Sequence, residues 1–104
     1  MKQIKIIQGD SYTLEIDFEG ITIELVDSIY LTCSELSICK KLVKDIVNNL
    51  FRFSITPQES KDFANGVYNY DLTINFVNKD TKTVQYRSTM VILEKNNKVV
   101  CYEW

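Results

Sequence analysis

The sequence predicts an all-β fold, an antiparallel sandwich of two sheets or a barrel, with about seven to eight strands and one short helical turn. Three observations lead to this prediction. Apolar and polar residues alternate with a period of two along several segments, as in strands with one buried face. Turn-forming residues separate these segments at intervals of roughly 8–12 residues. The single proline follows a good helix-capping residue.

The first two segments are both predicted to be strands. Residues 2–7 fit an edge strand, and residues 11–19 alternate strictly between apolar and polar positions. One face of the second segment is acidic for most of its length. The other face is apolar and consists of Tyr12, Leu14, Ile16 and Phe18. We therefore expect residues 11–19 to place this apolar face on the core.

The middle of the chain is harder to assign. Residues 21–26 form a short apolar connector or a strand, and residues 29–33 alternate as a third strand. Residues 36–47 fit neither the helical nor the strand period. A helical turn over residues 40–47 is one reading, but the β-branched residues in this stretch favour a strand.

A strand followed by a short helix is predicted next. Residues 49–55 alternate around two phenylalanines. Thr56 is a good N-cap, Pro57 suits the first helical position, and Glu59 completes a capping box. The predicted helix runs only from Pro57 to Phe63, and we expect Phe63 to pack it against the core.

The last third of the chain is predicted to consist of strands and turns. Gly66 supplies a turn because it can take a positive φ. The long strand that follows has one apolar face, made of Tyr68, Tyr70, Leu72, Ile74 and Phe76. The remaining expectations are a polar turn at 78–81, an extended stretch at 83–86, a strand at 89–94, a turn at 95–98 and a last strand at 99–104.

Composition indicates one domain, residues 1–104, and narrows the possible partners. The net charge is −2, and no basic patch is present that could displace counterions from a nucleic acid. No apolar run approaches the roughly 20 residues that cross a bilayer, and no signal sequence precedes the first strand. We therefore expect a protein made in a cytoplasm. Three cysteines without close spacing predict no disulfide framework, with Cys33 as a small buried hydrophobe.

The residues that most often carry catalysis are missing. Histidine is absent, which excludes a Ser–His–Asp triad, a Cys–His pair and histidine metal sites. The three glycines form no phosphate-binding loop. Glu15, Asp17 and Glu19 share one strand face, and a solvated row explains them better than catalytic carboxylates or a calcium site. We expect no enzyme activity, catalytic residues, metal, cofactor or small-molecule substrate.

Three stretches together resemble a known family. They are QGDSYTLEIDF at residues 8–18, FRFSITPQES at residues 51–60 and GVYNYDLTI at residues 66–74. In this order they are similar to the Ig-like β-sandwich module at the N-terminus of phage baseplate upper proteins and related tail or virion proteins. The resemblance implies an antiparallel Ig-like β-sandwich without an active site, so no functional residues are carried over.

The resemblance implies a phage or prophage structural or assembly protein, as a baseplate, tail or head accessory subunit. Such a protein would be made in the bacterial host cytoplasm, reside in the virion, and act through contacts with other virion proteins or by self-assembly. The alternative is a small phage-encoded inhibitor of a host protein, of the anti-defence type. Tyr102 and Trp104 are the candidate interface residues, because exposed Tyr and Trp are favoured interface anchors.

Overall fold

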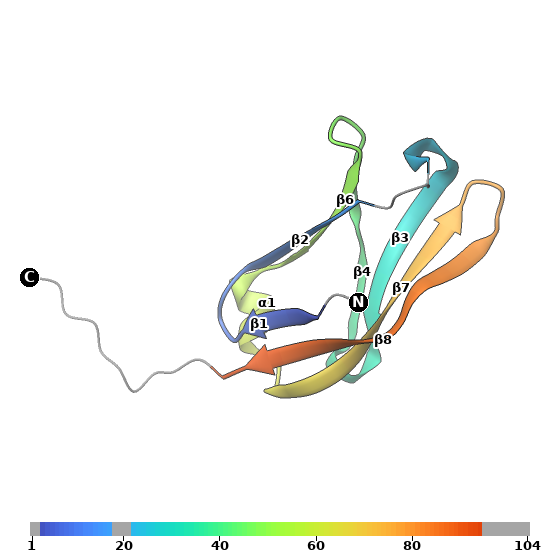
Figure 1. Cartoon of the computed structure of the whole chain (residues 1–104). Coiled ribbons are helices and arrows are strands. Elements are labelled where there is room, and N and C mark those ends of the chain that lie inside the picture. The colour runs from blue at the N-terminus through green and yellow to red at the C-terminus, as the bar shows by residue number, and fades with distance from the viewer. Residues whose placement is uncertain (1–2, 18–21, 95–104) are drawn as a thin grey trace, which may run out of the picture.

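The computed structural model describes residues 3–17 and 22–94. Within them the chain forms two sheets, with strand orders β1-β8-β7-β3-β4 and β2-β6-β5, which confirms the predicted all-β sandwich (Figure 1). The strands are β1 Ile4–Ile7, β2 Tyr12–Ile16, β3 Val26–Cys33, β4 Ile38–Lys41, β5 Val43–Asp45, β6 Leu50–Ile55, β7 Gly66–Phe76 and β8 Thr81–Leu93. The helical elements are η1 Ile23–Leu25, η2 Ser34–Leu36 and α1 Pro57–Lys61.

The order of the strands is that of the immunoglobulin fold. Strands β2, β6 and β5 take the places of B, E and D, while β8, β7 and β3 take those of G, F and C. A further hallmark lies at the start of β7, where the Tyr68 hydroxyl donates a 2.8 Å hydrogen bond to the carbonyl of Ala64. This is the tyrosine corner of Ig-like sandwiches, which fixes the chain as it enters that strand.

One pairing departs from the fully antiparallel prediction. Strand β1 pairs with β8 in parallel, with Ile4 opposite Met90 and Ile7 opposite Leu93. After β1 the chain turns at Gly9, whose φ is 83°, and enters β2 in the other sheet. Because β1 and β2 belong to different sheets, they form no hairpin. Strand β1 instead lies beside β8, at the edge of the five-stranded sheet.

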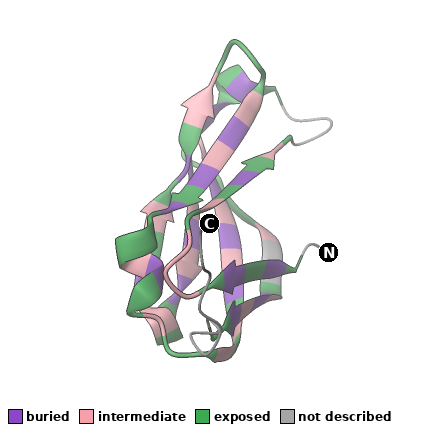
Figure 2. Cartoon of the chain, turned by 90° about the vertical axis from the view of Figure 1, so that its left-hand side faces the viewer, coloured by how far each residue is buried: buried purple, intermediate pink, exposed green. Residues whose placement is uncertain are grey.

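The core lies between the sheets and follows the predicted alternation (Figure 2). Leu14 on β2 is buried, Tyr12 and Ile16 are half-buried, and Phe18 lies outside the described residues. Cys33 is buried as expected. The apolar residues of the core that are 2 % exposed or less are Ile4, Ile6, Val26, Ile29, Leu31, Cys33, Phe53, Ile55, Tyr70, Leu72, Ile74, Met90 and Ile92.

The path of the chain between the two sheets explains the structure of the two segments that the sequence left open between strand and other structure. Residues 23–25 form the short 3₁₀ helix η1 rather than a strand, and β3 begins directly after it. The helical turn considered for residues 40–47 does not form. That stretch makes β4 in one sheet and β5 in the other, and the chain crosses at Leu42. Leu42 is buried, and its N–H donates a 2.8 Å bond to Ile29, which fixes the crossing.

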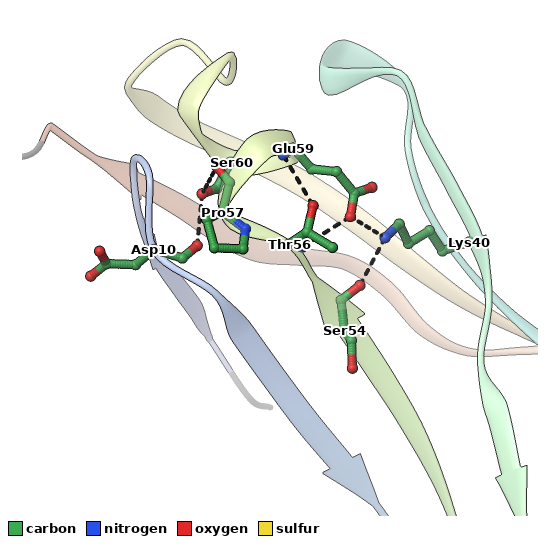
Figure 3. Close-up of polar contacts among 7 residues, drawn as sticks. All are labelled: Asp10, Lys40, Ser54, Thr56, Pro57, Glu59 and Ser60. Atoms are coloured by element: carbon green, nitrogen blue, oxygen red, sulfur yellow. Dashed lines mark hydrogen bonds and ion pairs between the residues drawn. The ribbon is translucent and has the colours of Figure 1, made fainter.

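The predicted capping box is present at the start of α1 (Figure 3). The Thr56 hydroxyl accepts from the Glu59 N–H at 3.2 Å, and Glu59 accepts from the Thr56 N–H at 2.9 Å. The helix ends at Lys61, one half-turn earlier than predicted, and Phe63 packs against the core as expected. Ser60 is fully buried, and its hydroxyl donates to the Asp10 carbonyl at 2.7 Å, which ties α1 to the turn after β1.

The two strands predicted at 83–86 and 89–94 are one strand, β8, with an irregularity between them. The register with β7 shifts around Asp71, and Arg87 has a positive φ of 54°. The Asp71 carboxylate accepts a 2.8 Å hydrogen bond from the Arg87 N–H. This bond stabilises a β-bulge, which explains why the alternation along β8 is interrupted.

Lys40 spans the open side of the sandwich between β4 and the end of β6 (Figure 3). Its ammonium group donates to the Ser54 carbonyl at 2.8 Å and to the Glu59 carboxylate at 2.7 Å. The hydrogen bond from Lys40, followed by that from the Thr56 N–H, holds the pKa of Glu59 below its ordinary value of 4.5. Glu59 therefore contributes stability in its charged form.

We expect this contribution to be present above the ordinary pKa and to be lost as the pH falls through the lowered pKa of the folded state. Replacing Glu59 by Gln should reduce the free energy of unfolding at neutral pH by less than about 1 kcal/mol, because the pair is partly exposed and screened. Urea unfolding at a series of pH values would measure this. The two stability curves should converge on acidification below pH 4.5. A constant offset between them would contradict the assignment.

Candidate functional site

Among residues 3–17 and 22–94, no group of three or more Cys, Asp or Glu side chains is placed to hold a metal ion. None of the helices in this part of the chain is long and apolar enough to cross a membrane. The described surface carries a set of large aliphatic side chains that are exposed to solvent. Four of them, Leu25, Ile46, Val47 and Val77, lie on loops at one end of the molecule, which is termed the loop end.

The loop end is built from three segments distant in sequence. They are η1, the β5–β6 turn at residues 46–49 and the β7–β8 turn at residues 77–80, which all lie at the upper end of the molecule in Figure 1. The Val77 N–H donates to the Leu25 carbonyl at 3.0 Å, which joins the first segment to the third. Lys44 on β5, shortly before the second segment, donates to the carbonyl of Val26, directly after the first, at 2.7 Å.

The β5–β6 turn carries its aliphatic pair on a backbone fixed by Asp45. The Asp45 carboxylate accepts from the Asn48 N–H at 3.1 Å and from the Asn48 side-chain amide at 2.8 Å. These hydrogen bonds from Asn48 are the main cause that lowers the pKa of Asp45 below its ordinary value. A 3.3 Å hydrogen bond from the Arg52 guanidinium to the Asp45 carboxylate lowers this pKa further. Asn49 takes the left-handed conformation that the turn requires, with a φ of 56°. Val47 at the tip is 93 % exposed and Ile46 is 64 % exposed.

The β7–β8 turn is fixed in a similar way. The Asp80 N–H donates to Asn78 Oδ1 at 3.0 Å, and Asn78 Nδ2 donates to the Asp80 carboxylate at 3.1 Å. Lys79 has a φ of 76°, and its N–H donates to the Phe76 carbonyl at 3.0 Å. A hollow of about 340 Å³ lies beside this turn and is lined in part by Asp27 and Val77.

These features together suit the docking of a partner at the loop end. The turns are already held in one conformation, so little backbone freedom is lost when a partner covers them. Exposed aliphatic residues scattered singly would be unremarkable, but a cluster on three adjoining loops indicates an interaction site. Charges of both signs are exposed at and beside these loops, acidic at Glu24, Asp27 and Asp80 and basic at Lys79 and Lys82.

A second depression, of about 620 Å³, lies on the outer face of the five-stranded sheet. Its charged lining consists of Glu35, Asp71 and Arg87, and Cys39 is also exposed there. The Asp71 carboxylate is committed to the backbone of the bulge, as described above. This bond places the bulge at the wall of the hollow.

The acidic row predicted on β2 is a solvated face where it is described. Glu15 and Asp17 are exposed, and Glu19 lies outside the described residues. Glu15 forms a 3.0 Å ion pair with Arg52, which also contacts Asp45 on the far strand. The guanidinium group thus neutralises part of the row.

The predicted interface residues, Tyr102 and Trp104, also lie outside the described residues, so their role stays a prediction. The sequence reasoning missed the loop end. A signal for it was present in residues 45–49, where two aliphatic residues stand between turn formers, Asp on one side and two Asn on the other. The convergence of the three loops depends on the topology and could not be inferred from any one of them.

Comparison with known proteins supports the fold. No family model matches the chain, and no curated protein matches it. Among solved structures, the chain is similar to the fibronectin(III)-like modules of Clostridium thermocellum CbhA, with a TM-score of 0.57 and 11 % identity over 88 % of this chain and 42 % of that one. A proposed glycoside hydrolase from Bacteroides vulgatus has a TM-score of 0.45 and 13 % identity, over 90 % of this chain and 17 % of that one. The chain thus has an Ig-like β-sandwich fold similar to fibronectin(III)-like modules, and it spans less than half the length of both proteins.

Proposed function

We propose that the chain is a non-enzymatic docking module that acts through protein–protein contacts at its loop end. The observation that carries this proposal is the cluster of exposed aliphatic side chains on three adjoining, preorganised loops. In Ig-like sandwiches the loops at one end are a common place for recognition, because the sheets hold them rigidly while their side chains vary.

The finer proposal is a structural or assembly subunit of a phage or prophage particle, in a baseplate, tail or head. Support comes from the resemblance of residues 8–18, 51–60 and 66–74 to phage modules. A subunit of this kind needs an exposed apolar surface that its neighbour covers when the particle assembles. The loop end has this character.

The test uses particles of the phage or prophage that encodes the chain, with the gene supplied as wild type or as a variant. Val47→Asp should lower incorporation about tenfold or more, since burying a Val-sized side chain contributes about 1.5–3 kcal/mol and 1.4 kcal/mol is tenfold. Gln58→Asp adds the same charge to α1, far from the loop end, and should incorporate like wild type. Quantitative mass spectrometry of purified particles measures both.

The possible outcomes separate the parts of the proposal. Absence of the wild-type chain from the particles would overturn the structural role. Equal incorporation of the Val47→Asp and Gln58→Asp variants would overturn the assignment of the loop end. Recovery of the chain outside particles, in a one-to-one complex with a single host protein, would favour the inhibitor function instead.

A further inference from the structure

Strand β4 is an edge of the five-stranded sheet, and part of its backbone faces away from the sheet. Along an antiparallel pair, residues alternate between bonding to the neighbouring strand and facing away from it. The N–H of Leu42, just beyond β4, donates to the Ile29 carbonyl on β3. The N–H and C=O groups of Cys39 and Lys41 therefore point away from β3. Among residues 3–17 and 22–94, no strand pairs with that side of β4.

A hollow lies on each side of this edge, and residues 37–39 line both of them. The outer hollow is the depression of about 620 Å³ described above, whose charged lining consists of Glu35, Asp71 and Arg87. Two carboxylates against one guanidinium give this lining a net negative charge. Burial, and then the charges of Glu35 and Asp71, raise the pKa of the Cys33 thiol, so both carboxylates act on this part of the sheet. The outer hollow therefore suits a basic side chain.

The inner hollow, of about 320 Å³, lies between β4 and α1 and has a different character. The half-buried side chains of Leu36 and Phe63 form its apolar walls. Lys40 and Glu59 also line it, but their 2.7 Å ion pair offsets the two charges (Figure 3). The inner hollow therefore suits an apolar side chain.

We propose that an extended segment of a partner protein adds to β4 as a further strand, with basic side chains toward the outer hollow and apolar side chains toward the inner one. Successive side chains of a strand point to opposite faces, so one segment reaches both hollows. The backbone groups of Cys39 and Lys41 bond to this segment and supply affinity, while the two hollows supply specificity.

A second copy of this chain is a poorer occupant of the edge. Pairing of β4 with β4 would place Lys40 and Lys41 of both copies on adjacent strands, where like charges repel. Strand β4 has only 4 residues, whereas a stable dimer interface takes some 20–30 residues a side. A short segment needs no such area, because the hollows on both sides of the edge receive its side chains.

The probe is a set of fluorescently labelled hexapeptides with the pattern Thr-X-Val-X-Val-Thr, in which X is Arg, Lys, Ser or Glu. Fluorescence anisotropy with the full chain measures binding. The Arg and Lys peptides should bind severalfold more tightly than the Glu peptide, and this difference should shrink at high salt because salt screens exposed charges.

Four variants test which groups hold the peptide. Cys39→Pro removes the outward N–H from an edge strand, where proline is tolerated, and should weaken binding of the Arg peptide about tenfold or more. Cys39→Ser keeps the backbone and should bind like wild type. Lys5→Pro is the matched control on the opposite edge, since the Gln8 N–H donates to Leu93 and Lys5 therefore faces away from β8. It should also bind like wild type, whereas Glu35→Lys should reverse the preference for Arg over Glu.

Several results would overturn the proposal. One is a set in which no peptide binds with a dissociation constant below about 1 mM. Others are equal binding of the Arg and Glu peptides to wild type, or equal binding by the two proline variants. A wild-type dimer in sedimentation equilibrium that Cys39→Pro abolishes would assign the edge to a second copy instead. Circular dichroism checks that the proline variants keep the fold, and Glu35→Lys tests the outer hollow without altering the backbone. None of these readings depends on the loop end.

Discussion

Replacing Phe53 by Ala is expected to lower the free energy of unfolding by about 3–5 kcal/mol. Phe53 lies on β6, the central strand of the three-stranded sheet, and is 1 % exposed. Its ring meets Tyr12 edge to face at a centroid distance of 6.4 Å, and its backbone pairs with Leu14. Because the Phe53 ring is almost fully buried in the core, the loss should lie toward the upper part of this range.

Urea unfolding followed by circular dichroism measures the effect. A domain of this size has a total stability of roughly 5–15 kcal/mol, so the variant would lose a large part of it. Phe53→Leu is the matched control and should cost much less, because it keeps most of the apolar volume. A loss below about 1 kcal/mol for Phe53→Ala would show that the sheets pack less closely around this ring than the structure describes.

Gly66→Ala is the second substitution with a large expected effect, a loss of about 1–3 kcal/mol. Gly66 has a φ of +152°, which residues with a β-carbon rarely adopt, and an added β-carbon would lie 3.3 Å from the Tyr68 hydroxyl oxygen. The substitution therefore strains the backbone and crowds the tyrosine that bonds to Ala64.

Tyr68→Phe separates these two causes. Alone it should cost about 0.5–1.5 kcal/mol, the usual value for one hydrogen bond. The double variant lacks the hydroxyl that the new β-carbon would crowd. Its loss of unfolding free energy should therefore be smaller than the sum of the losses in the two single variants. Strict additivity, measured by urea unfolding of all four proteins, would show that backbone strain at Gly66 acts independently of the tyrosine corner.

The sequence predicted the elements whose cause is local. The alternation along β2 and β7, and the capping box from Thr56 to Glu59, depend on neighbouring residues and were found where expected. The parallel pairing of β1 with β8 and the crossing at Leu42 were missed, because both depend on residues far apart in the chain. The loop end was missed for the same reason, since Leu25, Val47 and Val77 become neighbours only through the topology.

The pairing of β1 with β8 also governs when the fold can be completed during synthesis. Ile4 cannot pair until Met90 has been synthesised, nor Ile7 until Leu93, so β1 precedes the other described strands in the chain but pairs only once β8 is present. Pairings this remote in sequence form slowly, because a long loop must close before any bond rewards it. Strand β1 therefore stays unpaired while the residues between it and the end of β8 are synthesised, and the charge of Lys5, between Ile4 and Ile6, disfavours its association with strands of other chains.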